Sequence, residues 1–181
     1  WVEGGRVSFD GVDDYISIGI TGMPATDAAK TIEFWLERRN SSTGVLVSLH
    51  GGSSNLIAIR ADGSARKWGD AVLVSASVAP ENNVWRHYAY TFDGTTHRLY
   101  KDAIANGEST IANNTGAVTT GNIGRRSVGT AFHFDGSIDD VRIYTRALSQ
   151  AEILMDMNTP VGSSGSPPNA ATNAAVTFTV Q

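Results

Sequence analysis

Apolar and polar residues alternate in short runs along most of the chain, and the clearest run covers residues 31–37. There Ile32, Phe34 and Leu36 would share one face of a strand, while Glu33 and Trp35 would lie on the other. Similar runs predict strands at 7–10, 15–18, 45–50, 56–60, 72–75, 85–92, 98–101, 122–124 and 132–134. Turn residues recur roughly every 8 to 12 positions, which predicts an all-β, two-sheet antiparallel β-sandwich.

The stretch from 134 to 157 combines one more strand with the only helix that we predict. Residues 138–144 are mostly β-branched or aromatic and follow a Phe-Asp-Gly turn, so they should form a strand. Ser149 and Glu152 have the spacing of a capping box, so a short C-terminal helix should run from Gln150 to about Met157.

Two consecutive carboxylates, Asp139 and Asp140, lie within the strand expected at 138–144. Side chains alternate between the two faces of a strand, so these two should point in opposite directions. A carboxylate that faces the sheet interior is costly without a partner. A bound cation would be such a partner.

The end of the chain has a different composition from the rest. Residues 1–160 form the predicted jelly-roll domain, and the Gly-, Ser- and Pro-rich residues 161–169 form a flexible linker. Residues 170–181 form an extra strand, because Val176, Phe178 and Val180 alternate with smaller residues. This strand could begin a following domain, or it could complete a sheet of this domain or of a neighbouring one.

Composition excludes several classes of function. The 181 residues carry a net charge of -4, which argues against nucleic acid or an anionic membrane surface as a partner. The chain has no cysteine, so thiol chemistry and disulfides are excluded. Its apolar runs are shorter than the roughly 18 residues that a membrane span needs, so membrane insertion is not expected.

Three motifs resemble those of laminin-G-like, concanavalin A-like jelly-roll domains. They are Val7-Ser8-Phe9-Asp10-Gly11-Val12-Asp13-Asp14-Tyr15-Ile16, Trp85-Arg86-His87-Tyr88-Ala89-Tyr90-Thr91-Phe92-Asp93-Gly94, and Gly136-Ser137-Ile138-Asp139-Asp140-Val141-Arg142-Ile143-Tyr144. Their order and spacing cover roughly residues 5–157. The resemblance implies a jelly-roll sandwich, and it is much less specific for function.

A structural calcium site is expected between the acidic turn 10–14 and the strand at 138–144. Several carboxylates with nearby glycine carbonyls provide the oxygen ligands that Ca²⁺ prefers. The resemblance implies that such an ion joins an N-terminal loop to the Asp of the last strand, which gives Asp10, Asp13 and Asp139 as ligands. The alternative is that these carboxylates only accept hydrogen bonds within turns.

Catalysis is not expected, although some members of the family that the chain resembles are glucanases. Glu33 and Glu37 share a strand face but lie four residues apart, or about 13 Å. Glycosidases need carboxyl groups about 5 to 9.5 Å apart. The Glu-x-Asp-x-x-Glu signature of related β-glucanases is missing from the sequence.

The resemblance instead implies a carbohydrate-binding or adhesion module of a secreted or cell-surface protein. Candidate sugar contacts are aromatic residues with polar neighbours, because flat rings stack on sugars and charged groups hold hydroxyls. We predict Trp68 with Arg66, and Trp35 with Glu33, although Trp35 lies in a strand where packing in the core is the alternative. The expected partner is a polysaccharide or glycan. The alternative is protein adhesion, including self-assembly through the strand at 170–181.

Overall fold

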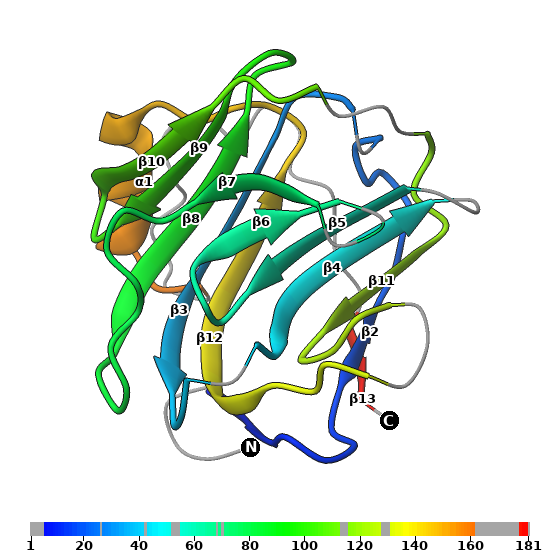
Figure 1. The fold of residues 1–181 in the computed structure, drawn as a ribbon, viewed down its shortest axis with the longest axis vertical. Helices are drawn as coiled ribbons and strands as arrows, with labels where there is room; N and C mark the ends of the chain where they lie inside the picture. The colour runs from blue at the N-terminus through cyan, green and yellow to red at the C-terminus, as the bar shows by residue number, and fades with distance from the viewer. Residues whose placement is uncertain are drawn as a thin grey trace.

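The computed structural model describes residues 6–25, 27–41, 43–51, 55–67, 69, 71–112, 116–127, 131–161 and 178–180. They form two antiparallel sheets that pack face to face, with one short helix outside them (Figure 1). The predicted fold class, a two-sheet antiparallel sandwich with a C-terminal helix, is therefore confirmed.

We name the two sheets A and B. Sheet A contains, in spatial order, β1 (Val7–Asp10), β12 (Asp135–Tyr144), β3 (Lys30–Arg38), β8 (Arg86–Phe92), β9 (His97–Lys101) and β10 (Ile104–Ser109). Sheet B contains β13 (Phe178–Val180), β2 (Ile16–Ile18), β11 (Thr120–Ile123), β4 (Val45–Gly51), β5 (Asn55–Arg60), β6 (Ser64–Arg66) and β7 (Val72–Ser75). The sequence did not predict β6, which is only three residues long, or β10, which lacks a clear alternation.

Apolar side chains from the inner faces of the two sheets form the main core. Sheet A contributes Ile32, Phe34 and Leu36, each at most 1% exposed, as the alternation of residues 31–37 predicts. Sheet B contributes Val47 and Ile57, which are fully buried. A cavity of about 20 Å³ remains between the sheets. It has room for about one water molecule.

Two copies of the sequence Phe-Asp-Gly close one end of the core. Phe9 at the end of β1 pairs with Gly136 in β12, and its ring lies 6.0 Å from the ring of Phe134. Both rings are at most 1% exposed. A Cβ at Gly124 would lie 2.3 Å from the ring of Phe9, so this position requires glycine. The repeated motif, which reads as a turn in the sequence, therefore also supplies a pair of core aromatics.

A bulge interrupts β12 at the acidic pair. Asp139 lies opposite Trp35, but the next paired residue, Arg142, lies opposite Glu33. An advance of two residues along β3 thus corresponds to an advance of three along β12, which is a β-bulge. Within the bulge, Asp140 takes a left-handed backbone conformation with φ of 47°. Strict alternation fails here, so the expectation that Asp139 and Asp140 point to opposite faces does not follow from the register.

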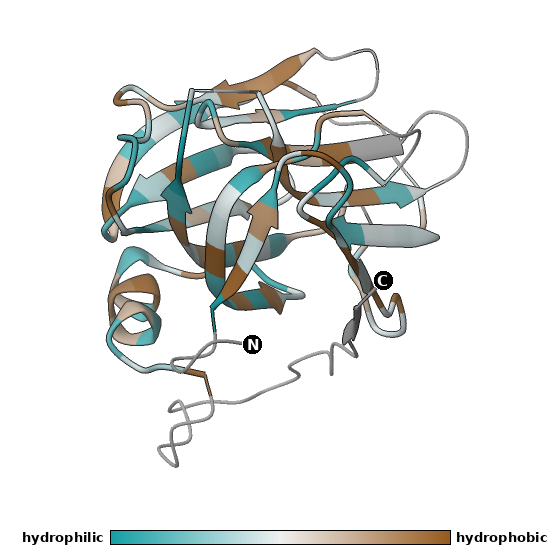
Figure 2. Cartoon of the chain, turned by 90° about the horizontal axis from the view of Figure 1, so that it is seen from below, coloured by the Kyte–Doolittle hydropathy of each residue, from teal (hydrophilic) through white to brown (hydrophobic). Residues whose placement is uncertain are grey.

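The helix α1 (Gln150–Met157) lies on the outer side of sheet A (Figure 2). Its predicted capping box is confirmed, because Ser149 and Glu152 exchange hydrogen bonds between side chain and backbone. Among the described residues, no helix is long and apolar enough to cross a membrane.

The last described strand, β13, pairs antiparallel with β2 at the edge of sheet B. Phe178 lies opposite Ile18, and Val180 lies opposite Ile16. The C-terminal residues 178–180 thus lie against the N-terminal part of the chain, as Figure 1 shows. Most of the linker predicted at 161–169 lies outside the described residues.

Candidate functional site

The helix α1 covers part of the outer face of sheet A. Ile153 of the helix is fully buried, and Leu148 just before it is 4% exposed. Both pack against Ala89, Tyr100 and Tyr144 of the sheet. Burial of such side chains stabilises the folded state by about 1.5–3 kcal/mol each. This part of sheet A is therefore an interior surface.

A network of buried polar groups lies beneath the helix. The side chain of Glu33 is 0% exposed, and its Oε1 atom lies 3.5 Å from Nη1 of Arg142. The same nitrogen of Arg142 donates to the carbonyl oxygen of Asp156 at 2.9 Å, and Nη2 donates to that of Thr159. The hydroxyl of Tyr144 donates to the Asp156 carboxylate at 2.7 Å. Arg142 thereby ties the C-terminal end of α1 to sheet A.

Burial governs the protonation of this network. Burial, and after it the nearby Asp156 carboxylate, raise the pKa of Glu33 while Arg142 lowers it, and the net result is a pKa of about 8. Burial also lowers the pKa of His87 to about 4. Glu33 is therefore mainly a neutral acid at pH 7, and it can donate a hydrogen bond to Asp156. These groups hold the helix in place and do not face an open cleft.

The outer face of sheet B carries the half-buried ring of Phe132 and several cationic side chains. Phe132 packs on Val45 and Ala58 of sheet B. The guanidinium of Arg60 lies 4.4 Å from the centre of the Phe132 ring, and that of Arg126 lies 5.3 Å from it. Both distances are typical of cation–π contacts. The half-buried ring of Phe132 thus contacts two arginines.

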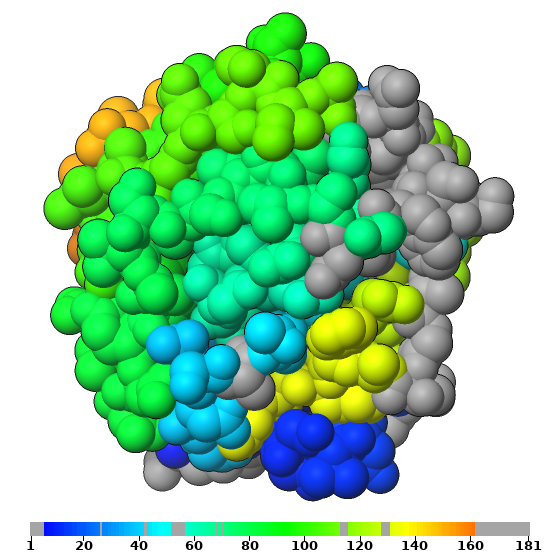
Figure 3. Space-filling view, in the orientation of Figure 1, coloured from blue at the N-terminus to red at the C-terminus, as the bar shows by residue number. Residues whose placement is uncertain are grey.

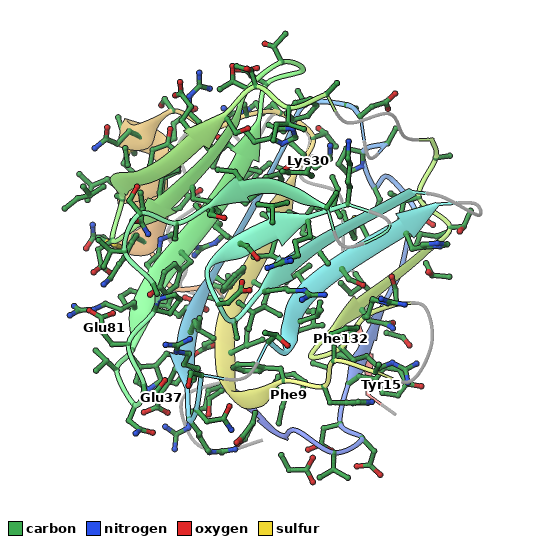
Figure 4. The ribbon with its side chains drawn as sticks, viewed as in Figure 1. Phe9, Tyr15, Lys30, Glu37, Glu81 and Phe132 are labelled. Carbon is green, nitrogen blue, oxygen red and sulfur yellow. The ribbon has the colours of Figure 1, made fainter. Side chains whose placement is uncertain are left out.

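Arg125, next to Arg126 in the chain, makes a similar contact with a second aromatic ring. The guanidinium of Arg125 lies 3.3 Å from the centre of the Tyr15 ring. Ser127 fixes the segment to the sheet, because its backbone N–H donates to the hydroxyl of Ser48 at 2.6 Å. Consecutive arginines therefore contact Tyr15 and Phe132, which Figure 4 labels at the same end of sheet B.

A fourth arginine lies further along sheet B. Arg66 is the cross-strand partner of Ala58, on which Phe132 packs, and it forms an ion pair with Asp62 at 3.1 Å. His50 belongs to the same surroundings, because burial and the charge of Arg126 both lower its pKa. We call this surface the arginine face, and we define it as Tyr15, His50, Arg60, Arg66, Arg125, Arg126 and Phe132.

Figure 3 looks onto this side of the molecule. The yellow segment that contains Phe132 lies against the cyan and teal strands β4 to β6. The blue residues that connect β1 to β2 lie beside the yellow segment at the lower rim. That connection contains the acidic turn, which therefore lies beside the yellow segment.

The acidic turn brings three carboxylates together. Single oxygens of Asp10, Asp13 and Asp14 lie within 4.8 Å of one another, and all three residues are exposed. Asp10 accepts a hydrogen bond from the N–H of Val12, and Asp14 accepts one from the N–H of Asp10. The hydrogen bonds within the turn that the sequence analysis gave as the alternative to calcium binding are therefore present. Each of these two carboxylates keeps a second oxygen, and an oxygen-only donor set of this kind fits Ca²⁺.

The structure brings together some of the residues predicted for the metal site. Asp10 and Asp13 lie close, and Asp14 joins them. The β12 residue opposite Asp10 is Asp135, which lies four positions, or about 13 Å, from Asp139 along the strand. Asp135 is held by Arg39 at 2.9 Å and by Asn40 at 2.6 Å. Asp139 instead accepts a hydrogen bond from the N–H of Asp140.

The described residues that we predicted as ligand contacts do not lie together: Glu33 and Trp35 are in sheet A, and Arg66 is in sheet B. Glu33 is buried beneath α1, so its assignment as a surface contact needs correction. Trp35 is half-buried on sheet A and lies edge-on to His87, so it is not a core residue either. Arg66 lies on the arginine face. Trp68 lies outside the described residues, and its role stays a prediction.

Sequence analysis missed most of the arginine face. Its members come from separate segments, and only folding brings them together. The available signals were the Arg125-Arg126 pair directly after a predicted strand and the aromatic residue Phe132 shortly after that pair.

Comparisons with known proteins agree with this architecture. The laminin G family model described as the concanavalin A-like lectin/glucanases superfamily matches residues 10–154. No curated protein sequence matches the chain. A native heptameric SAP-like pentraxin from Limulus polyphemus is similar in structure, with a TM-score of 0.68 and 13% identity, over 97% of this chain and 94% of that one.

Two further solved structures are parts of enzymes. Domain 4 of AbnA, an extracellular GH43 arabinanase from Geobacillus stearothermophilus, solved in complex with arabinotriose, has a TM-score of 0.65 and 13% identity over 82% of this chain and 74% of that one. The NanB sialidase from Streptococcus pneumoniae has a TM-score of 0.55 and 16% identity, over 70% of this chain but only 23% of the sialidase. At these identities the likeness shows a shared fold.

Proposed function

Because the chain belongs to the concanavalin A-like lectin/glucanases superfamily, we propose that it is a non-catalytic carbohydrate-binding module of a larger secreted or cell-surface protein. The similar AbnA domain, which was solved with a bound arabinotriose, supports this proposal. Lectin-like folds carry their function in sites placed on a common scaffold, so the site must be argued from this chain.

The observation that carries the proposal is the contrast between the two outer sheet faces. Sheet A is covered by α1 around Glu33, whereas sheet B presents the half-buried rings of Tyr15 and Phe132 among polar side chains. Aromatic rings beside hydrogen-bonding groups are the combination that holds a sugar. The arginine face is the proposed binding surface.

The non-catalytic assignment rests on the carboxylates. Glycosidases place an acid and a base on either side of the scissile bond. Glu33 is enclosed beneath α1 with Arg142 as its partner, so substrate cannot reach it in this fold. Glu37, at about 13 Å along the same strand, is too distant to complete such a pair.

A glycan array followed by titration calorimetry tests the binding function. The wild-type chain should bind at least one class of polysaccharide. Phe132→Ala should weaken that binding about tenfold, equivalent to about 1.4 kcal/mol, because it removes the central ring of the arginine face. Thermal unfolding of the variant would confirm that it folds.

Trp35→Ala on sheet A is the matched control, and it should leave the affinity unchanged. If Trp35→Ala removes binding while Phe132→Ala does not, the binding face is on sheet A and our assignment is wrong. If the wild-type chain binds no glycan at millimolar protein concentration, the runner-up function, adhesion to protein, is favoured. The pairing of β13 with β2 in its own chain supports a role in completing sheet B, in place of donation to a second copy.

We also propose that the acidic turn holds a structural Ca²⁺ through Asp10, Asp13 and Asp14. Three carboxylates within 4.8 Å repel one another, and a divalent cation would offset that repulsion. The ion would fix the connection between β1 in sheet A and β2 in sheet B. Asp139 lies about 13 Å along β12 from Asp135, the residue opposite Asp10, so we leave it out of the proposed ligand set.

Removal of calcium should lower the melting temperature. At a free Ca²⁺ concentration ten times the dissociation constant, binding stabilises the folded state by about 1.4 kcal/mol, which EDTA would remove. Differential scanning calorimetry with and without EDTA measures this change. Asp13→Ala should abolish the response to EDTA, whereas Asp139→Ala should retain it. A wild-type melting temperature that is indifferent to both calcium and EDTA would contradict the site.

A further inference from the structure

We propose that the edge of β2 is an acceptor site for an extended peptide strand of a partner protein, and that β13 of the same chain occupies this site as a displaceable strand. The partner strand would run antiparallel to β2 and carry apolar residues at alternate positions. The inference is independent of carbohydrate binding, because it concerns the backbone edge of sheet B and not its outer face.

The acceptor site is the side of β2 that faces β13. The strand β2 pairs with β11 on one side and with β13 on the other. In the order of sheet B, β13 is the last strand, so β2 would be the edge of the sheet without it (Figure 1). The backbone N–H and C=O groups along a bare edge of this kind pair readily with another extended segment.

The opposite edge of sheet B is closed more firmly. The backbone N–H of Ser77, just after β7, donates to the carbonyl oxygen of Asn106 in β10 at 2.6 Å. The side chain of Asn106 also exchanges two hydrogen bonds with the backbone of Val78, at 2.9 and 3.0 Å. Asn106 is 7% exposed, so these bonds lie largely away from water and join sheet B to sheet A. The edge at β2 depends instead on one added strand.

That added strand is short, and its register gives the chemistry of the site. The strand β13 has three residues, whereas strands usually have about 5–6. Phe178 is opposite Ile18, and Val180 is opposite Ile16. Both isoleucines are 5% exposed and belong to the main core. A strand that replaces β13 therefore needs apolar residues at every second position, and it would bind more strongly if it paired over more residues.

The covalent connection of β13 offsets its short pairing. Residues 162–177 connect the described end of the domain to β13, and a stretch of this length spans at most about 55 Å. Such a connection typically gives an effective concentration of the order of millimolar at the site. The β13 strand of a second copy offers the same three pairs without this advantage. A longer strand from a partner protein can displace β13, which is why we assign the site to such a partner.

Fluorescence anisotropy with a labelled peptide of residues 173–181 tests the inference on the full chain. The wild-type chain should bind this peptide only at about millimolar concentration, because its own β13 competes. The variant Phe178→Pro/Thr179→Pro should bind it at least tenfold more tightly. The N–H groups of successive strand residues point to opposite sides, so one of the two prolines removes a donor to β2.

Ala170→Pro/Ala171→Pro, which lies before β13, is the matched control and should bind the peptide as the wild type does. A peptide with prolines at positions 178 and 179 should bind neither chain. Thermal unfolding checks that the strand variant is folded, and Val180→Gly offers a milder weakening of β13 if it is not.

A folded strand variant that binds no peptide at millimolar concentration would overturn the inference. Equal binding by the wild type and the folded strand variant, or equal binding of the two peptides, would overturn it as well. These outcomes leave the proposed carbohydrate binding untouched, because the glycan array tests that function separately.

Discussion

Phe134→Ala should lower the free energy of unfolding by about 3–5 kcal/mol. The ring of Phe134 is 0% exposed and lies 6.0 Å from that of Phe9, at the point where β1 and β12 close the end of the core. Truncation would leave a cavity that the rigid backbone on both sides cannot fill. Urea unfolding followed by tryptophan fluorescence measures the change.

Phe132→Ala is the control for this prediction, because it removes the same ring two residues earlier in the chain. Phe132 is half-buried on the outer face of sheet B and packs mainly on Val45 and Ala58. Phe132→Ala should lower the free energy of unfolding by less than half as much as Phe134→Ala. Equal costs would mean that Phe134 does not occupy the core position described.

Glu33→Gln should make the protein more stable than the wild type at pH 8, by about 2–4 kcal/mol, and should have little effect at pH 4. The cause is the burial that raises the pKa of Glu33 in the folded protein from 4.5 to about 8. Gln keeps the shape of the neutral acid and has no proton to lose.

The sign follows from proton binding. Between pH 4.5 and pH 8 the folded chain retains a proton on Glu33 that the unfolded chain has lost. The stability that this group contributes is fully present below pH 4.5 and declines as the pH rises to about 8. His87, whose pKa burial lowers to about 4, acts in the opposite direction between pH 4 and 6.5. It is present in both proteins, so its effect cancels in the difference between variant and wild type.

Chemical denaturation of both proteins from pH 4 to pH 9 tests this prediction. The difference in unfolding free energy should increase with pH and then level off above about pH 8. If Glu33→Gln is instead less stable by a constant amount at all pH values, Glu33 is ionised in the folded protein and forms an ion pair with Arg142.

Local patterns predicted the secondary structure well where they were strong. The alternation at Ile32, Phe34 and Leu36 gave both a strand and its buried face, because period-two burial is a local property. The capping box at Ser149 likewise determined where α1 begins. The bulge after Asp139 could not be predicted in this way, since it appears only when β12 is aligned with β3.

For the candidate site, local patterns predicted less, and the tertiary structure decided more. The sequence identified the acidic turn, whose members are neighbours in the chain, and it paired Asp10 with Asp139 only through a family resemblance. The register of β1 and β12 places Asp135 opposite Asp10 instead. A difference of four residues along a strand is about 13 Å, which decides whether two carboxylates can share an ion.

By itself, the sequence determined the class of fold, the helix and the acidic turn, because each depends on residues a few positions apart. The tertiary structure alone decided that Glu33 is enclosed beneath α1 and that Arg60, Arg66 and Arg125 share a surface with Phe132. The physical reason is that burial and charge clustering depend on which distant segments pack together. The choice of sheet B as the binding face therefore came from the packing of α1 on sheet A.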